Sequence, residues 1–168
     1  MQQISGAAPW PTGRLKDSGA TAREIIDSNL YMVLGTADET GQPWATPVYY
    51  AVADYTDFYW VSSPAATHSR NIAVRPQVGI VVFNSQVPIG AGQGVYMSAE
   101  AAEVAEADLE RGIDIFSRRS LGHGGPPWTA DDVRGLALIR LYRATAREHS
   151  ILAKDGRPDH RIPVKVTR

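Results

Sequence analysis

The sequence predicts a mainly β protein, a small β-barrel with short helices attached to it. Three observations carry this prediction. About six runs of the chain are rich in β-branched and aromatic residues, as strands are. The first three runs are joined by short polar links without helices, which argues against a doubly wound parallel sheet. A chain of 168 residues can bury one sizeable core, so we expect a single folded domain.

The composition limits the class of protein. Charged residues make up 21% of the chain and hydrophobic residues 43%, as in ordinary soluble domains. The net charge of −1 provides no field that would attract nucleic acid or an anionic membrane. There is no cysteine, which excludes disulfides, thiol nucleophiles and cysteine-based metal centres. Neither a signal-peptide pattern nor a membrane-length apolar run occurs, so we expect a cytoplasmic protein with no membrane partner.

The first 18 residues are predicted to form an N-terminal arm. Residues 1–18 contain prolines and glycines with little periodicity, which is typical of an arm rather than a folded element. We therefore expect residues 19–168 to form the barrel domain. Its first element should be a short helix over residues 20–29, for which Ser18 or Thr21 can serve as the N-cap.

Three predicted strands follow the first helix. Residues 30–37 are rich in β-formers, and a polar turn containing Gly41 joins them to a second run over residues 43–53. Another turn leads to an aromatic third run over residues 58–62. Links this short are typical of hairpins, so the three strands should form an antiparallel meander.

The stretch after the third strand is the candidate functional segment. Ser63 is a good N-cap and Pro64 suits the first helical position, in a helix expected to end at Val74 before Arg75-Pro76. The free N–H groups and positive dipole of a helix start attract anions, and Arg70 adds a cation that can hold two phosphate oxygens. The simpler alternative is a capped helix that binds nothing, with Arg70 solvated.

The remaining elements continue the β-rich pattern. The fourth strand is apolar on both faces, which predicts a central position in the sheet. A glycine-rich loop that ends at Trp128 is expected to be flexible and able to close over a site. In chain order, these elements are a strand over residues 77–84, a strand over 93–104 with a bend at Glu100 and Glu103, a helix over 107–121, the loop over 122–128, one helical turn over 129–133, a strand over 136–146 with helix as the alternative, and a β-like end over 162–166.

Several kinds of catalytic site are missing from the sequence. The glycines at positions 90, 92 and 94 lie before a strand rather than a helix, so they do not form a dinucleotide-binding fingerprint. No phosphate loop or nucleophile elbow occurs. The four histidines are scattered, so we expect no metal site. If the protein is an enzyme, a bound cofactor should carry its chemistry.

Several segments occur in an order and spacing that resemble a known family. They are Leu34-Gly35-Thr36-Ala37-Asp38, Gly41–Val48, Phe58–Ser63, His68-Ser69-Arg70-Asn71-Ile72, Arg75–Val78 and Gly94–Ala101. Together they resemble the pyridoxamine 5′-phosphate oxidase-like family of FMN-binding split β-barrels. The likeness lies within residues 28–106, with a weaker echo at 140–145.

The resemblance implies a homodimer that holds one FMN in each of two clefts between its subunits. Ser69 and Arg70 would hold the phosphate, with Ser62, Ser63, His68 and Asn71 in the same segment. The flavin ring would be lined by Thr46, Pro47, Val48 and Tyr49, largely through backbone hydrogen bonds. Gln93 would reach the cofactor from the partner subunit. The chain offers His68 and Arg70 where family members often place lysine, and the contacts for a substrate phosphate have no match here.

Three functions are therefore open at this stage. The first is an FMN-dependent oxidoreductase that acts on an unidentified small organic substrate. The second is a reductase that uses a deazaflavin coenzyme instead of FMN. The third is a non-catalytic protein that binds flavin or haem, with His68, His123 or His149 as the axial ligand of a haem.

Overall fold

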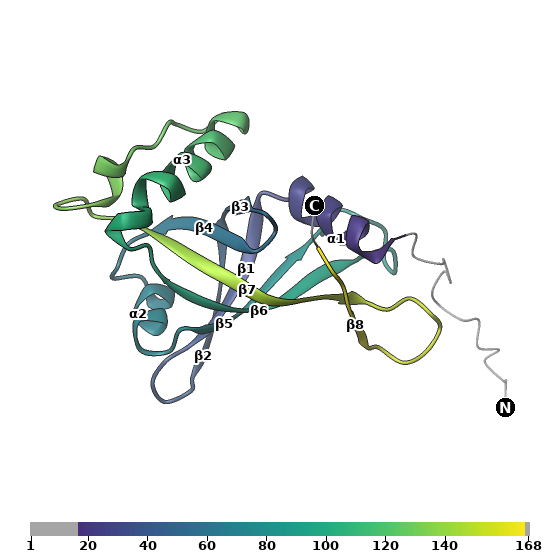
Figure 1. Ribbon diagram of the computed structural model, residues 1–168. Coiled ribbons are helices and arrows are strands. Elements are labelled where there is room, and N and C mark those ends of the chain that lie inside the picture. The colour runs from purple at the N-terminus through teal and green to yellow at the C-terminus, as the bar shows by residue number, and fades with distance from the viewer. Residues whose placement is uncertain (1–16, 167–168) are drawn as a thin grey trace, which may run out of the picture.

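The computed structural model describes residues 17–166, so most of the predicted arm lies outside the described residues (Figure 1). The elements follow in this order: α1 (Ser18–Ser28), β1 (Tyr31–Ala37), β2 (Pro43–Tyr49), β3 (Ala51–Ala53), β4 (Asp57–Ser62), α2 (Thr67–Val74), β5 (Gln77–Phe83), β6 (Gly94–Glu103), α3 (Glu106–Gly122), the 3-10 turn η1 (Ala130–Val133), β7 (Arg140–Leu152) and β8 (Arg161–Pro163). No helix in this part of the chain is long and apolar enough to cross a membrane.

The strands form one curled antiparallel sheet in the order β2-β1-β5-β6-β7-β4-β3, with β8 paired to β7. Tyr50 alone separates β2 from β3, although these strands stand at opposite ends of that order. The two ends of the sheet must therefore lie next to each other, which curls the sheet into a barrel. The fold class predicted from the sequence is confirmed. Both antiparallel pairings of the predicted meander occur, but its single middle strand is wrong, because residues 43–53 divide into β2, which pairs with β1, and β3, which pairs with β4.

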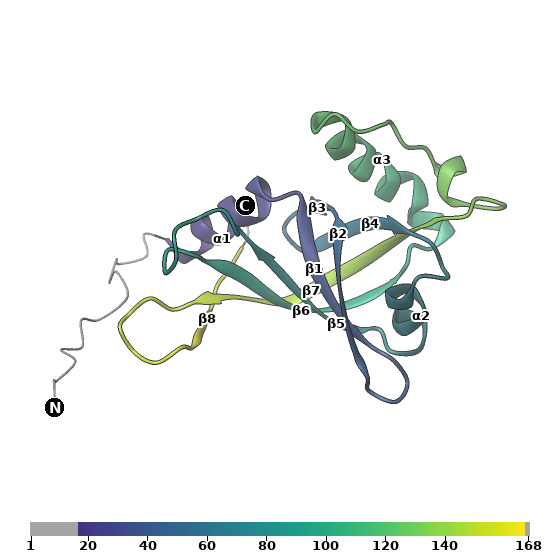
Figure 2. The same cartoon turned by 180° about the vertical axis from the view of Figure 1, so that it is seen from behind.

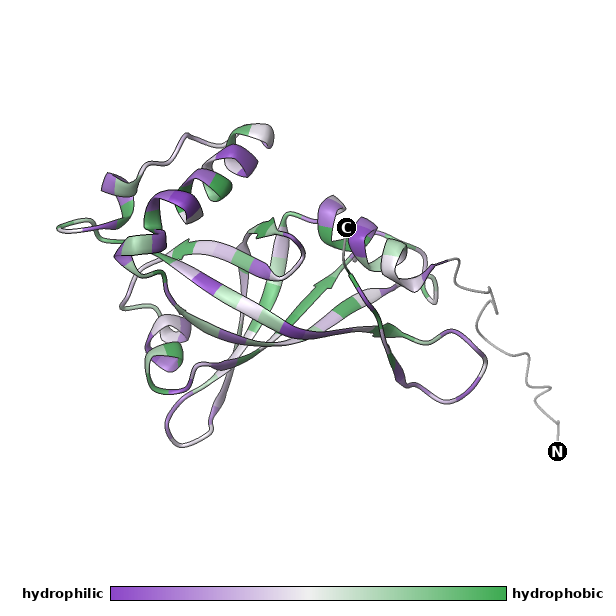
Figure 3. Ribbon diagram, viewed as in Figure 1, coloured by the Kyte–Doolittle hydropathy of each residue, from purple (hydrophilic) through white to green (hydrophobic). Residues whose placement is uncertain are grey.

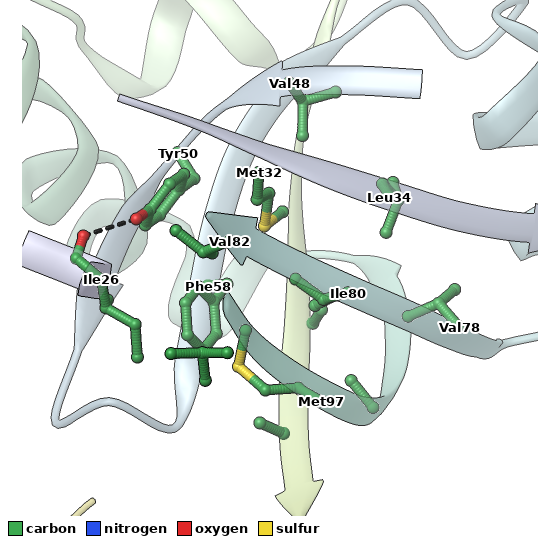
Figure 4. Packing of buried hydrophobic residues seen from close by; sticks show 14 of the residues in the cluster. Ile26, Met32, Leu34, Val48, Tyr50, Phe58, Val78, Ile80, Val82 and Met97 are labelled. Carbon is green, nitrogen blue, oxygen red and sulfur yellow. Dashed lines mark hydrogen bonds between the residues drawn. The ribbon is translucent and has the colours of Figure 1, made fainter. Parts of the chain in front are cut away.

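The break at Tyr50 has a physical cause in the packing. Its side chain is fully buried, and its hydroxyl donates a hydrogen bond to the carbonyl oxygen of Ile26 at 2.5 Å (Figure 4). Burying a tyrosine is favourable when its hydroxyl finds such a partner. The side chain thus fastens the barrel to the end of α1, among inward-facing residues such as Met32, Leu34 and Phe58.

The central strand β5 has one buried face rather than two. Val78, Ile80 and Val82 point into the core, whereas Gly79 and Phe83 are exposed and Val81 is half-buried. The strand is central, as predicted, but its outer side has no cover from the described residues. Most of the outer sides of β1, β2 and β6 is open as well, although the guanidinium of Arg161 lies 4.1 Å over the ring of Tyr96 on β6. We call the mainly apolar part of this surface the bare face, and the polar residues Gln77, Ser98 and Glu100 continue the same outer side at one end. The members of the bare face are Tyr31, Val33, Gly35, Ala45, Pro47, Gly79, Val81, Phe83 and Tyr96.

The other half of the outer sheet surface is covered by α3, which both views show beside β3 and β4 (Figures 1 and 2). The helix is amphipathic, with hydrophilic and hydrophobic segments along its length (Figure 3). Its apolar side, which includes Leu109, Ile113 and Phe116, packs on Tyr59 and Leu141 of the sheet. The predicted helix over residues 107–121 is confirmed. The predicted helical turn over residues 129–133 is also confirmed, as η1.

Two helix starts differ from the sequence-based expectation. The cap of α1 is Asp17, whose carboxylate accepts hydrogen bonds from the backbone N–H groups of Gly19 and Ala20, so neither Ser18 nor Thr21 is the cap. The second helix begins at Thr67 instead of Pro64. Ser63 is used in a tight turn before it: its Oγ accepts from the N–H of Ala65 at 3.2 Å. A hydroxyl that closes a local turn cannot also cap the helix.

The last strands also differ in their limits. β7 covers Arg140–Leu152 rather than residues 136–146, because the Arg140 guanidinium binds the carbonyl oxygens of Gly135, Ala137 and Ile139 and holds that segment as a loop. The irregularity in β6 lies between Ser98 and Ala99, not at the glutamates. The β-like end is a short strand over residues 161–163.

Candidate functional site

The junction of β4 and α2 brings together most of the residues predicted to hold a phosphate. Ser62 ends β4, and its Oγ lies 2.8 Å from Nε2 of His68 in the first turn of α2. His68 is only 8% exposed, and burial lowers the pKa of its ring below the usual value. The ring is therefore neutral at neutral pH and serves to tie the strand end to the helix.

Ser69 and Arg70 follow on the same helix and differ in their surroundings. Ser69 is buried, and its Oγ has no hydrogen-bond partner of good geometry. Arg70 is exposed, and its guanidinium folds back onto the carbonyl of Ala65 and, at 3.4 Å, onto Oγ1 of Thr67. Among the described residues, Arg70 forms no ion pair. The site therefore offers a cation without a counter-ion next to a buried hydroxyl that has no hydrogen bond of good geometry.

A cavity of about 410 Å³ lies beside these two residues. Pro64, Tyr142 and Glu103 also line it, and Glu103 pairs with Arg140 at 3.5 Å. Burial raises the pKa of the Tyr142 hydroxyl, and a hydrogen-bonding interaction with Ser69 opposes that rise. We call Ser62, Ser63, His68, Ser69 and Arg70 the corner, because they surround the turn from β4 into α2.

Sequence reasoning missed Tyr142 and Glu103. Both reach the corner because β7 pairs with β4 and β6, so that Ser62 lies opposite Arg140 and Glu103 opposite Tyr142. Tyr142 also stacks on the buried Trp60, with ring centroids 5.7 Å apart. No local motif predicts such a contact, because it depends on the pairing of β4 with β7, whose paired residues are more than 75 positions apart in the chain.

Two predicted site residues are used within the chain. The amide of Asn71 is buried and donates to Oγ1 of Thr36 at 3.0 Å, which links α2 to β1. Gln93 donates from Nε2 to the carbonyl of Leu152 at 2.8 Å and accepts from the N–H groups of Gly94 and Leu152. The structure does not bring Gln93 to the corner of its own chain, and its reach toward a partner's cofactor stays a prediction.

The proposed ring-lining residues lie on β2, which pairs with β1 along one side. Val48 is buried in the barrel, Thr46 is half-buried and Pro47 is exposed. Tyr49 lies at the boundary between the bare face and α3, in edge contact with Tyr31 and Phe116. Burial raises the pKa of the Tyr49 hydroxyl, and the nearby Arg119 opposes that rise.

The loop over residues 122–128 is fastened to α3 rather than free to close. The Ser120 Oγ donates to the carbonyl of Pro126 at 2.8 Å, and the N–H of Trp128 donates to Oγ of Ser117 at 2.8 Å. The Trp128 ring packs edge-on against Phe116. The expectation of a flexible lid is therefore not met, and Trp128 belongs to the packing of α3.

The histidines differ in which ring nitrogen is available. Nε2 of His68 faces Ser62, and Nε2 of His149 lies 2.7 Å from the carbonyl oxygen of Tyr55. In the exposed His123, Nδ1 lies 2.9 Å from the Arg119 carbonyl oxygen and 3.3 Å from the Tyr49 hydroxyl. Among the described residues Nε2 of His123 has no hydrogen-bond partner, so it is the ring nitrogen left for a ligand. Within residues 17–166, no three acidic or histidine side chains gather as metal ligands.

Comparisons with known proteins support the same family. The family model described as Pyridoxamine 5′-phosphate oxidase matches residues 19–148. A haem-binding protein from Mycobacterium smegmatis has a TM-score of 0.69 at 19% identity, over 89% of this chain and 60% of that one. This chain thus spans less than two thirds of that relative. No curated protein matches significantly.

Two further solved structures show how varied such proteins are. A FAD-binding protein from Mesorhizobium loti has a TM-score of 0.59 at 17% identity, over 80% of this chain and 93% of that one. An F420 reductase has a TM-score of 0.57 at 14% identity, over 76% and 94%. At such identities these likenesses establish the fold, a split barrel shared by flavin-binding, haem-binding and F420-dependent proteins.

Proposed function

Because this chain belongs to the pyridoxamine 5′-phosphate oxidase family, we propose that it binds FMN and serves as a flavin-dependent oxidoreductase for a small organic substrate. In this proposal the protein is a homodimer, with one cofactor in each cleft between the subunits. The single observation that carries the proposal is the corner, where a cation without a counter-ion among the described residues and a buried hydroxyl without a hydrogen bond of good geometry lie on one helix turn.

The residues of the corner fit a phosphate group. A buried hydroxyl without a hydrogen bond of good geometry is costly, and a phosphate oxygen would give Ser69 a well-placed acceptor. Arg70 contacts only neutral oxygens, so a dianion can draw its guanidinium away without breaking an ion pair. His68 and Ser62 would form the supporting layer, since their mutual hydrogen bond fixes the start of the helix.

The strand β2 fits the flat edge of a flavin ring. It pairs with β1 on one side and stands at the end of the strand order, so its other side leaves backbone groups for a ligand. Such groups could bind the polar edge of the ring over Thr46, Pro47 and Val48. FMN would supply the redox chemistry, and this chain would bind the cofactor and orient the substrate.

The bare face supports the homodimer. In an antiparallel sheet with one solvated face, the outer positions are normally polar. Here the outer positions of β1 and β5 are Tyr31, Val33, Gly35, Gly79 and Val81 among others, none of them charged. An apolar surface of this kind marks a contact with another protein. A second copy of this face is the simplest cover, because a two-fold contact places identical patches against each other.

A titration with FMN tests the proposal. The purified protein should show a yellow flavin spectrum, with flavin released on denaturation. Arg70→Ala should weaken FMN binding by about 1.5–3 kcal/mol, or roughly 10- to 150-fold, which is the range for a charge-assisted hydrogen bond. The matched control is Arg118→Ala, because Arg118 is also exposed but pairs with Asp114 at 2.9 Å on the surface of α3.

The outcomes separate the candidate functions. Equal loss in both arginine variants, or no loss in either, would remove the corner from the cofactor site. A colourless protein that binds deazaflavin coenzyme and not FMN would indicate the deazaflavin-dependent reductase. Bound flavin without hydride transfer to or from any tested partner would indicate a carrier.

Haem binding is the second candidate, and one observation favours a particular ligand. His123 has a free and exposed Nε2, whereas Nε2 of His68 and of His149 are both occupied. A haem complex should therefore show a Soret band that His123→Ala shifts and that His149→Ala leaves in place. A Soret band unchanged by His123→Ala would exclude this assignment.

A further inference from the structure

The loop between η1 and β7 exposes two leucines. Leu136 is 101% exposed and Leu138 is 86% exposed, although both are among the most hydrophobic side chains. Single apolar residues on a surface are common, but two fully exposed leucines on one short loop form an unpartnered apolar projection. We call residues 135–138 the knob.

The knob is held rigidly by two arginines. The Arg140 guanidinium donates to the carbonyl oxygens of Ala137, Ile139 and Gly135 at 2.5, 2.8 and 2.9 Å. The guanidinium of Arg134, at the start of the loop, contacts the carboxylates of Asp131, Glu106 and Glu110. Gly135 supplies the left-handed backbone that the bend requires, with φ of 57°. A loop fixed in this way loses little conformational entropy when it binds a partner.

The knob stands next to the corner. Arg140, which organises the knob, lies opposite Ser62 in the pairing of β7 with β4. If the cofactor lies between two subunits, the knob is therefore at the end of the barrel where the second subunit approaches.

The bare face contains a hollow that fits such a projection. It has a volume of about 900 Å³, and its lining includes Val33, Val81 and Tyr96. Two glycines, Gly35 and Gly79, lie opposite each other in its floor. A methyl group added at Gly79 would meet no atom within 4 Å, so the floor is open to an incoming side chain.

The charges beside the two features are largely paired within the chain. Next to the knob, Arg134 contacts Asp131, Glu106 and Glu110, and Arg140 pairs with Glu103. At the rim of the hollow, Arg147 pairs with Glu100 at 2.6 Å. Apolar burial is therefore what would drive the contact between the knob and the hollow.

We propose that Leu136 and Leu138 of each subunit insert into the hollow of the other subunit. Both apolar features of one chain are then covered by a second copy, and each contact occurs twice, as a two-fold axis requires. This inference rests on the proposed homodimer and adds to it the segment that locks the two subunits together beside the cofactor.

Sedimentation of a double variant tests the knob. Leu136→Asp with Leu138→Asp should raise the dissociation constant of the dimer at least about 100-fold, because four leucines per dimer lose their burial. Ile89→Asp is the matched control, since Ile89 is 102% exposed on another loop, and it should leave the dimer unchanged. Circular dichroism confirms that each variant is folded.

The outcomes distinguish this inference from the proposed function. A wild-type protein that is monomeric at all accessible concentrations would overturn the homodimer and the inference with it. A dimeric wild type whose double variant stays dimeric to the same dilution would overturn only the inference. FMN affinity is measured separately on every variant, so a failure of cofactor binding is recognised as such.

Cross-linking tests where the knob inserts. Because the chain contains no cysteine, an introduced pair reports one contact without background. Leu138→Cys combined with Val81→Cys should give a covalent dimer under mild oxidation, above the yield of either single variant. Ile89→Cys combined with Val81→Cys should not exceed those yields. Equal yields for the two pairs would place the knob elsewhere and overturn the proposed insertion.

Discussion

The two halves of the outer sheet surface have the same alternating side-chain pattern but different covers. On the β3-β4-β7 half, Tyr59 and Leu141 are buried under Phe116 and Ile113 of α3. On the β2-β1-β5-β6 half, residues of similar character such as Val81 and Phe83 face no other described element. The outer side of the sheet thus has two hydrophobic surfaces. Helix α3 covers one of them, and the described residues leave the other largely open.

The hydrophobic core under α3 is therefore formed within one chain, whereas burial of the bare face requires a further cover. The α3-covered half draws its stability from contacts within one chain, so it should not depend on protein concentration. The bare face should depend on concentration if a second chain covers it. Tyr49 lies at the boundary, with Tyr31 on one side and Phe116 on the other, and it follows directly after the other proposed ring-lining residues.

The largest expected effect is on the covered half. Phe116→Ala should lower the free energy of unfolding by about 3–5 kcal/mol, since it removes a buried ring from the contact between α3 and the sheet. Urea unfolding at several protein concentrations measures this free energy, and its decrease in Phe116→Ala should be the same at each concentration. Phe83→Ala, at a site 47% exposed on the bare face, is the control. A loss from Phe116→Ala that vanished on dilution would contradict the division into two halves.

A charge introduced on the bare face should weaken the association of the subunits rather than the folding of each chain. Val81→Lys should leave the barrel folded but weaken the dimer about 100-fold or more, because an unpaired ammonium would be buried at the contact. Analytical ultracentrifugation measures the change. Ile89→Lys is its control on an exposed loop. An unaltered dimer would show that the second subunit sits elsewhere.

Stability should also depend on pH through buried histidine. Burial lowers the pKa of His68 in the folded protein below its unfolded value of 6.5. The unfolded chain then binds the proton more readily, so the contribution of this neutral ring is complete above pH 6.5 and is lost as the pH falls below that value, by at most about 1.4 kcal/mol per pH unit.

Urea midpoints measured between about pH 5 and pH 8 would show this loss. His68→Gln should make the profile shallower, and the slope that remains should come from His149, whose pKa burial also lowers. The exposed His123 is the site of the control variant His123→Gln. Because His68 is buried by its own chain, the profile should persist in the Val81→Lys monomer. A profile that disappears in that monomer would assign the effect to the subunit contact.

The smallest expected effects are those of two glycine-to-alanine substitutions, one under α3 and one on the bare face. Gly112→Ala in α3 would place a methyl group 2.9 Å from Cδ2 of Leu141 and 3.0 Å from a ring carbon of Tyr59. Overpacking should outweigh the gain in helix propensity and leave a net loss of about 1 kcal/mol. The added methyl group of Gly79→Ala would meet no atom of residues 17–166 within 4 Å, so in the Val81→Lys monomer this substitution should raise the free energy of unfolding by about 0.5 kcal/mol.

Thermal unfolding of both glycine variants measures the sign of each change in the free energy of unfolding. Opposite signs support the division between a closed and an open surface. A loss from Gly79→Ala in the monomer would mean that the chain itself covers the bare face.

Much of the fold was predictable because it depends on local sequence. The runs that became β1, β4, β5 and β6 were recognised from their composition, and α3 was recognised from its helical spacing and stop at Gly122. The segment around His68 and Arg70 was also identified, because its residue types occur together in the chain. The start of α2 was misplaced, since the turn formed by Ser63 competes with the capping that its sequence suggests.

The residues alone predict a β-rich barrel, with several hydroxyls and one arginine gathered after the third predicted strand. Three features become visible only in the folded chain: Tyr50 divides one predicted strand between the two ends of the sheet, Tyr142 and Glu103 reach the corner, and residues 17–166 leave one outer surface open. The cause is the range over which the interactions act. Propensity and periodicity act over a few neighbouring residues, whereas strand order and burial depend on contacts between residues far apart in the chain.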